Sequence, residues 1–229
     1  MSYSLIIPIY NEILTLPILI DEVNKLEKNI QIIIVDDGSD DGSNKFLKNH
    51  INKIEVIKNK SNKGKGFSIR KGISFAKNQH IILIDGDLEI KINSIPKLIN
   101  EYEKNKNCTL VGKRWDQKDN LKFELNRIGN FVINTLFNFL YNSNLSDVLC
   151  CVRIIKTDLI KSLNLESKKF SIEIETLAKL VSSNENIIES KVDYQRRTAQ
   201  EGKKLKMTDA WRIILVMIKN KVFLKTINS

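Results

Sequence analysis

Short aliphatic runs alternate with longer segments of helical period along the first half of the chain. The runs fall at residues 5–9, 32–35, 54–57, 81–84 and 109–111. Between the first two runs, one helix face is formed by Leu16, Leu19, Ile20, Val23 and Leu26. Runs that are aliphatic throughout are typical of strands buried on both faces, so the pattern predicts a mainly parallel, Rossmann-like α/β sheet flanked by helices. Ligands of such sheets gather at the carboxyl ends of the strands.

The character of the sequence changes after about residue 115. Two long amphipathic helices are predicted at residues 121–141 and 207–221, and strand signals become sparse. Three prolines and nine glycines in 229 residues mark no linker between the halves. We therefore expect a single domain over residues 1–229, in which residues 1–115 and 116–229 form two parts of one site.

Acidic residues follow two of the predicted strands, at the edge where ligands are expected. The first cluster, residues 36–42, contains four aspartates and two glycines that permit a tight turn. Its carboxylates can accept hydrogen bonds from a nucleobase or a ribose hydroxyl. An acidic turn that caps a helix is the structural alternative.

The second cluster is Asp85-Gly86-Asp87, directly after the fourth predicted strand. In an extended segment, residues two apart direct both carboxylates to one side. A hard cation such as Mg²⁺ or Mn²⁺ takes oxygen ligands of this kind together with phosphates and waters. We therefore predict that Asp85 and Asp87 bind a divalent metal ion that neutralises a diphosphate leaving group.

A glycine-rich basic segment, residues 62–66, precedes a predicted helix and carries Lys65. Flexible backbone and positive charge at a helix start favour contact with an anionic nucleotide. The segment matches neither the Walker loop nor the dinucleotide fingerprint, which argues against ATP and hydride chemistry.

Four motifs in this order resemble those of the family 2 glycosyltransferases, particularly the dolichyl-phosphate mannose synthase group. They are residues 8–12 (PIYNE), residues 35–42 (VDDGSDDG), residues 62–66 (NKGKG) and residues 85–89 (DGDLE). The match is strong over residues 1–115 and thinner through residues 112–114, 147–153, Arg197 and 202–205. The resemblance implies a GT-A fold, a UDP- or GDP-sugar donor, a divalent metal and inversion at the anomeric carbon. It makes residues 1–115 the nucleotide-sugar-binding half.

The resemblance also implies roles for individual residues. The nucleoside site would be lined by Pro8, Tyr10, Glu12 and Asp37. Asp85 and Asp87 would hold the metal and the diphosphate, with Lys65 and Glu89 nearby. The donor or acceptor phosphates would be contacted by Arg114, Arg127, Arg197 and Lys204, although arginine and lysine on a basic protein are also ordinary surface residues.

Two departures from the family pattern concern the substrate site. Glu89 stands where the group usually has glutamine, which adds a carboxylate beside the metal. Residues 147–153 read Asp-Val-Leu-Cys-Cys-Val-Arg where the family usually has Asp-x-x-Ser-Gly-Phe-Arg. The missing glycine indicates a reshaped acceptor pocket.

The identity of the acceptor decides whether a general base is needed. A polyprenyl phosphate is already an anion and needs only cations such as Arg114 and Arg127 to position it. A diacylglycerol or sugar hydroxyl must lose a proton, and Asp147 is then the candidate base, with helix capping as the alternative. The candidate catalytic residues are thus Asp87, Asp147 and Arg114.

Charge and apolar helix faces predict a membrane surface as partner. The formal net charge is +10, so an anionic partner is expected. Apolar stripes are formed by Leu125, Ile128, Phe131, Val132, Thr135, Leu136, Phe139 and Leu140, and by Trp211, Ile214, Leu215 and Ile218. The second stripe adjoins basic residues, as in helices that lie in a membrane interface, whereas packing on the sheet is the alternative for both. Residues 116–229 are thus expected to form an acceptor and membrane-associating half.

The location follows from three further features. No export signal and no run of about twenty apolar residues is seen, so neither secretion nor a spanning helix is predicted. The three cysteines match neither a disulfide framework nor a zinc site, which favours a reducing compartment. We expect a cytoplasmic enzyme, peripheral at the inner face of the membrane.

Two other functions remain open on the sequence. One is transfer of the sugar to a soluble or polymeric glycan. The other is a basic nucleic-acid-binding protein, but the basic residues are dispersed and no nucleic-acid motif or aromatic platform appears, so no nucleic-acid partner is predicted. Turnover of nucleotide sugars with lipid acceptors separates these functions.

Overall fold

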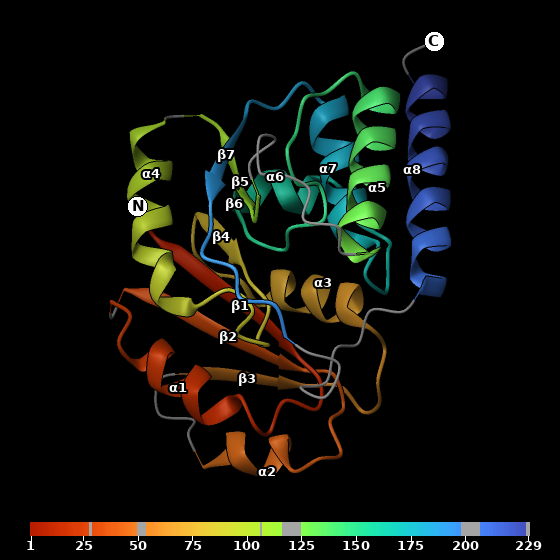
Figure 1. The fold of residues 1–229 in the computed structure, drawn as a ribbon. Coiled ribbons are helices and arrows are strands. Elements are labelled where there is room, and N and C mark those ends of the chain that lie inside the picture. Colours follow the sequence, from red (N-terminus) through yellow and green to blue (C-terminus); the bar gives the residue numbers. More distant parts are fainter. Residues whose placement is uncertain (28, 50–53, 106, 116–124, 198–206, 228–229) are drawn as a thin grey trace.

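The computed structural model describes residues 1–27, 29–49, 54–105, 107–115, 125–197 and 207–227 (Figure 1). The strands in this part of the chain are β1 (Tyr3–Ile9), β2 (Ile30–Asp36), β3 (Ile54–Lys58), β4 (His80–Leu83), β5 (Thr109–Lys113), β6 (Arg153–Lys156) and β7 (Ile187–Lys191). The helices are α1 (Leu16–Asn24), α2 (Ser43–Lys48), α3 (Lys65–Phe75), α4 (Ile95–Lys104), α5 (Leu125–Tyr141), α6 (Thr157–Ser162), α7 (Ile172–Ser182) and α8 (Met207–Ile227).

All seven strands form one sheet in the order β3-β2-β1-β4-β6-β5-β7. Every pairing is parallel except those of β6, which runs antiparallel to β4 and to β5. The predicted mainly parallel sheet is therefore confirmed, and the five predicted strands are found within two residues of their expected ends. Strands β6 and β7 lie in the half of the chain where the sequence predicted few strands.

Alternate residues of each central strand point into two separate cores. In β1, Leu5 and Ile7 face the side covered by α1 and α4, whereas Ile6 faces the side covered by α3, α5, α6, α7 and α8. The same alternation holds in β2, where Ile34 and Ile33 are completely buried on opposite faces. The continuous aliphatic runs in the sequence thus record burial on both faces.

Helices α5 and α8 lie side by side on the outer edge of the core that α3, α6 and α7 also cover (Figure 1). Among the side chains that the structure describes in these helices, the buried ones are Ile133, Phe137 and Tyr141 in α5 and Ile213 and Met217 in α8. Much of the predicted apolar stripes is exposed, namely Phe131, Val132, Phe139, Trp211, Leu215 and Ile218, whereas Leu136 and Leu140 of the α5 stripe are half-buried against the core. Among the described helices, none is both long and apolar enough to cross a membrane.

The order of the sheet places the acidic motifs together. The chain runs outward from β1 to β2 and β3, and then returns to place β4 on the other side of β1. Such a reversal of strand order leaves a crevice at the carboxyl ends of the strands. The segments that follow β1, β2 and β4 therefore meet there.

Candidate active site

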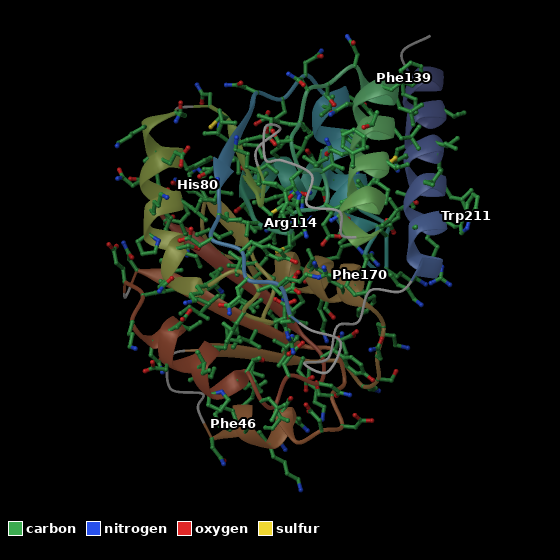
Figure 2. All side chains as sticks on the ribbon, in the orientation of Figure 1. Phe46, His80, Arg114, Phe139, Phe170 and Trp211 are labelled. Atoms are coloured by element: carbon green, nitrogen blue, oxygen red, sulfur yellow. The ribbon has the colours of Figure 1, made fainter. Side chains whose placement is uncertain are left out.

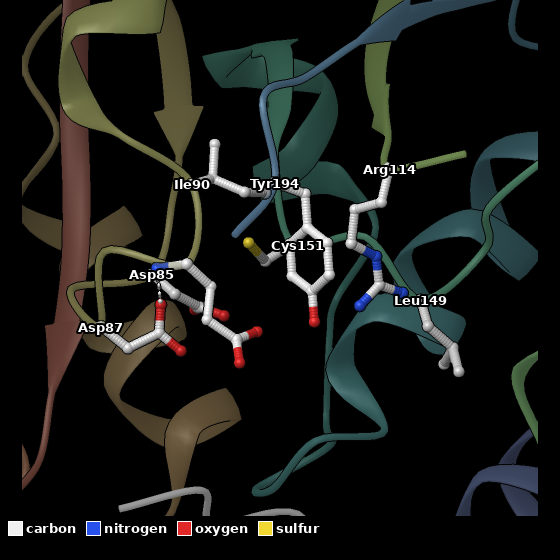
Figure 3. A pocket seen from close by; sticks show the side chains of 8 residues that line it. Asp85, Asp87, Ile90, Arg114, Leu149, Cys151 and Tyr194 are labelled. Carbon is white, nitrogen blue, oxygen red and sulfur yellow. Dashed lines mark hydrogen bonds between the residues drawn. The ribbon is translucent and has the colours of Figure 1, made fainter. Parts of the chain in front are cut away.

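The segment that follows β4 presents three carboxylates to one cleft. Asp85, Asp87 and Glu89 line it together with Arg114 and Tyr194, and Arg114 lies across the cleft from Asp85 and Asp87 (Figure 3). The cleft has a volume of about 280 Å³ including its open mouth, and is also lined by Ile90, Leu149 and Cys151. It joins the donor-side motif at residues 85–89 to residues from three later segments of the chain.

Gly86 allows this carboxylate turn to lie against β1. A Cβ at this position would lie 2.5 Å from Ile9 Cγ2 and 3.1 Å from Ile7 Cγ2, too close for any other residue. The turn is closed by the backbone N–H of Glu89, which donates to Asp87 Oδ1 at 3.0 Å. The glycine between the two aspartates is thus a packing requirement.

The electrostatics of the cleft favour a cation. Burial, together with the charges of Asp85 and Glu89, raises the pKa of Asp87 to about 7. A divalent ion would relieve this crowding of negative charge. Within the described ranges, no three His, Cys, Asp or Glu side chains converge tightly enough to hold a metal alone. Two carboxylates completed by phosphate oxygens and water fit the usual coordination of Mg²⁺ or Mn²⁺.

Lys65 is the first residue of α3, and its side chain extends into the same acidic cluster. Its ammonium donates to Asp85 Oδ2 at 2.7 Å and lies 2.5 Å from Glu173 Oε1. Burial by itself lowers the pKa of Lys65, but the charges of Asp85 and Glu173 raise it well above its usual value. Lys65 is therefore a permanent cation beside Asp85.

The residues predicted for the nucleoside are brought to the ends of β1 and β2. Pro8 and Tyr10 are half-buried there. Glu12 is 6% exposed and accepts hydrogen bonds from Arg197 Nη1 at 2.9 and 3.2 Å. Arg197 thus joins the donor half across 185 positions of sequence.

Asp37 is bound to the glycine-rich segment of its own chain. It is 3% exposed, and its oxygens accept hydrogen bonds from Asn59 Nδ2 and from the backbone N–H groups of Lys63 and Gly64. Asp37 therefore fixes the loop that carries Lys65. The interpretation that Asp37 itself contacts the nucleoside stays a prediction.

Arg114 and Asp147 form a bidentate ion pair at the other wall of the cleft. Arg114 Nε donates to Asp147 Oδ2 at 2.7 Å, and Nη2 donates to Oδ1 at 2.8 Å. The guanidinium also lies 4.8 Å from the ring centre of Trp115 and 5.3 Å from that of Tyr194. These contacts hold the Arg114 side chain rigidly at the cleft.

Some predicted residues fall outside the description, and some functional candidates were missed. Lys204 lies outside the described residues, and Arg127 lies in α5 at a position where the side chain is not described. Sequence reasoning missed Tyr194. Burial and the charge of Glu89 raise the pKa of Tyr194 to about 12, so its hydroxyl remains a hydrogen-bond donor. Sequence reasoning also missed Trp115 and Glu173. No local motif marks these three residues, because their partners lie far away in the sequence.

Gly66 gives a direct test of how tightly the Lys65 loop is packed. A Cβ at Gly66 would lie 2.4 Å from the backbone oxygen of Ser167, so we expect Gly66→Ala to lower the free energy of unfolding by about 1–3 kcal/mol. Urea unfolding measures the loss. As the matched control, Gly129→Ala in α5 meets no atom within 4 Å and should raise stability by about 0.5–1 kcal/mol. Equal effects at both positions would contradict the packing.

The mainly parallel sheet and the carboxylate-lined cleft at its edge fit a glycosyltransferase domain of GT-A architecture. The chain belongs to the family 2 glycosyltransferases, because the family model described as glycosyl transferase family 2 matches residues 4–163. The resemblance found in the sequence motifs is thereby confirmed.

Two of the similar proteins carry a lipid phosphate in their names. The chain is 32% identical to the dolichyl-phosphate beta-glucosyltransferase of Dictyostelium discoideum, over 48% of this chain and 39% of the relative. It is 27% identical to the dodecaprenyl-phosphate galacturonate synthase of Rhizobium johnstonii, over 72% of this chain and 51% of the relative. The matched regions thus span between about two fifths and half of the length of these relatives.

A solved structure confirms the architecture. The glucosyl-3-phosphoglycerate synthase of Mycobacterium tuberculosis, in complex with Mn²⁺, UDP and phosphoglyceric acid, superimposes with a TM-score of 0.77. The match covers 96% of this chain and 78% of that chain at 16% identity. At this identity the likeness establishes the shared fold alone.

Proposed function

We propose that this chain is an inverting, metal-dependent glycosyltransferase that moves a sugar from a UDP-sugar to a polyprenyl phosphate at a membrane surface. The observation that carries the proposal is the cleft itself, in which Asp85 and Asp87 lie across from Arg114. One wall suits a cation bound to a diphosphate, and the other suits an anionic acceptor. The names of the two lipid-phosphate relatives support the same acceptor class.

The donor side rests on the carboxylates that follow β4. Asp85 and Asp87 would hold Mg²⁺ or Mn²⁺, and the bound ion would neutralise the charge that develops on the diphosphate leaving group. Lys65 adds a fixed positive charge beside Asp85. The UDP bound in the structural relative, together with Mn²⁺, supports a UDP-sugar as the donor.

The acceptor side favours a phosphate over a neutral hydroxyl. Asp147 is 3% exposed, and both of its oxygens accept hydrogen bonds from Arg114. A carboxylate engaged in this way is poorly placed to take a proton from a diacylglycerol or sugar hydroxyl. A polyprenyl phosphate requires no such proton transfer. We therefore assign Asp147 to the positioning of Arg114, and Arg114 to the acceptor phosphate.

The exposed apolar surface of α5 and α8 supports attachment to a membrane. Trp211, Leu215 and Val222 in α8 are between 61 and 72% exposed, and Phe139 in α5 is 82% exposed. Trp211 projects away from the body of the molecule (Figure 2). Lys219 in α8 is 69% exposed at its side chain and pairs with the exposed Glu166 at 2.9 Å, a weak surface ion pair that anionic headgroups at the cytoplasmic face would compete with.

The proposed reaction is tested with purified protein and radiolabelled donors. Undecaprenyl phosphate, diacylglycerol and phosphoglyceric acid are offered separately as acceptors, each with UDP- and GDP-hexoses and hexuronic acids, in Mn²⁺ and in excess EDTA. We expect a lipid-linked product from a UDP-sugar with undecaprenyl phosphate, lost in EDTA. Product on phosphoglyceric acid or diacylglycerol alone, or from GDP-sugars alone, would contradict the proposal.

The membrane surface is tested separately by vesicle sedimentation. Replacing Trp211 and Leu215 with glutamate should lower binding to vesicles of phosphatidylglycerol and phosphatidylcholine by about tenfold or more, because two apolar anchors are lost and two like charges are added. The matched control replaces Leu14 and Ile18, before and within α1 at the opposite face of the sheet, with glutamate; these side chains are 85% and 56% exposed. Equal loss in both proteins would show that charge alone is responsible.

A further inference from the structure

The ammonium of Lys65 lies between a half-buried carboxylate, Asp85, and a buried one, Glu173, from distant parts of the sequence. Asp85 belongs to the turn after β4, and Glu173 belongs to the first turn of α7. The side chains of Lys65, Asp85 and Glu173 are 13%, 27% and 5% exposed. One positive charge is thus shared between two negative charges in a region with little water.

The two contacts of Lys65 differ in kind. The contact with Asp85 is a hydrogen bond, whereas the contact with Glu173 is an ion pair without hydrogen-bond geometry. Within the described part of the chain, neither carboxylate oxygen of Glu173 has a hydrogen-bond partner. The nearby Arg153 donates to the backbone oxygen of Glu173 and leaves its carboxylate unbonded. Glu173 therefore has unused capacity to accept a hydrogen bond from Lys65.

The backbone around Lys65 is fixed, so only its side chain is free to move between the two carboxylates. Gly64 and Gly66 pack against the segment before α7, where a Cβ would lie 2.3 Å from Lys168 O and 2.4 Å from Ser167 O, respectively. The N–H of Phe67 also donates to Lys168 O at 3.1 Å. Lys65 and Glu173 are thereby held close together by the fold.

We propose that Glu173 is a positioning residue that sets the cation affinity of Asp85 by drawing the ammonium of Lys65 away from it. The inference rests on the proposed function, because it concerns the same metal-binding carboxylate. In the absence of metal, Lys65 neutralises Asp85. When a divalent cation occupies Asp85, Lys65 turns fully to Glu173.

The reason is a competition between two cations for one carboxylate. A divalent ion at Asp85 repels an ammonium that lies 2.7 Å from the same oxygen, so metal binding requires another acceptor for Lys65. Glu173 supplies that acceptor without any movement of Lys65 into solvent, because its Oε1 already lies 2.5 Å from the Lys65 ammonium. Without the Glu173 charge, Lys65 would stay on Asp85 and compete more strongly with the metal.

The test is a double-mutant cycle on Mn²⁺ affinity, measured by electron paramagnetic resonance in the presence of UDP and without turnover. Glu173→Gln is expected to weaken Mn²⁺ binding by roughly tenfold, as for other groups that support a metal ligand. Lys65→Met should tighten it. In the Lys65→Met background, Glu173→Gln should change the affinity by less than about twofold, because its effect passes through Lys65.

Several outcomes would overturn the proposal. An unchanged affinity in Glu173→Gln excludes the role of Glu173, and an equal loss in both backgrounds shows a direct effect of its charge on the metal. The matched control, Glu166→Gln, removes a glutamate that is 72% exposed and paired with Lys219, and should leave the affinity unchanged. If the wild-type protein binds no Mn²⁺ with UDP, the proposed function itself fails.

Lys65→Met leaves Asp85 and Glu173 without their cation and is at risk of unfolding. A crystal structure of the wild-type protein with Mn²⁺ and UDP then decides. We expect the Lys65 ammonium to be hydrogen-bonded to Glu173 and more than about 3.5 Å from the Asp85 oxygens, beyond hydrogen-bond distance. An ammonium that remains bonded to Asp85 beside the metal would overturn the proposal.

Discussion

Replacing Asp87 with asparagine is expected to abolish Mn²⁺-dependent binding of UDP and to stabilise the metal-free protein above pH 7. Both effects have the same origin, which is the crowding of Asp87 by Asp85 and Glu89 and its burial. Asparagine keeps an oxygen to accept the N–H of Glu89 but carries no charge for a cation. We expect the affinity for UDP in Mn²⁺ to fall by at least about 10–100-fold.

The pH dependence follows from the sign of the shift. The folded-state pKa of Asp87 is about 7, above the value of about 3.9 for an unfolded chain. The folded state then binds more protons between these values, so the ionisation of Asp87 lowers stability as the pH rises from about 4 to about 7. The loss is complete above pH 7 and amounts to a few kcal/mol at most, because the side chain keeps some contact with solvent.

Asp87→Asn removes this loss, and the two proteins are compared by urea unfolding at pH 5 and pH 8 without metal. The free energy of unfolding of the variant should be close to that of the wild type at pH 5 and higher than that of the wild type at pH 8. Asp158→Asn, which neutralises an exposed aspartate of α6, is the control for a change of net charge. A variant that is less stable than the wild type at pH 8, or that still binds UDP more tightly with Mn²⁺, would refute the assignment of Asp87.

The second large effect is expected at Asp147. Asp147→Ala removes the partner of a guanidinium whose side chain is 14% exposed, and leaves Arg114 Nε and Nη2 without their acceptors. Breaking a buried ion pair in this way costs about 3–5 kcal/mol. For a chain of this length we expect a fall in Tm of about 10 °C.

Stability and activity together separate the two roles that Asp147 can have. If Asp147 positions Arg114, Asp147→Ala should lower the Tm of the protein, and replacing Arg114 with methionine in the same chain should restore part of the loss. A general base should lose turnover in Asp147→Asn while Tm and acceptor binding stay unchanged. Asp21→Ala, which breaks an exposed ion pair with Lys25, is the control and should cost less than about 1 kcal/mol.

Much of the donor side of the site could be predicted from the sequence. The strands that end before Asp37 and Asp85 were found from their aliphatic runs, and parallel order alone places their carboxyl ends at one edge. The glycines of residues 62–66 were predicted to make the backbone flexible; in the structure Gly64, Gly66 and Gly86 are instead positions of close packing. The aliphatic runs are local features, so neighbouring residues are sufficient to encode them.

The acceptor side was predicted less well, because its geometry depends on pairings across long stretches of chain. Strand β6 is four residues long and is inserted antiparallel between β4 and β5, out of sequence order. A strand of only four residues is too short to show a recognisable periodic pattern in the sequence. For the apolar stripe in α5 the sequence left membrane contact and burial open, and the packing of α5 against α7 and α8 determines which of its residues are covered.

By itself, then, the sequence determined the class of fold, the family and the two aspartates proposed to bind the metal, because strand periodicity and short motifs are written within a few residues. Only the tertiary structure decided what those residues face. It paired Arg114 with Asp147 over 33 positions and Lys65 with Glu173 from a distant helix. Such contacts depend on how helices and strands pack, and a buried charge takes its partner from whatever the packing brings within reach.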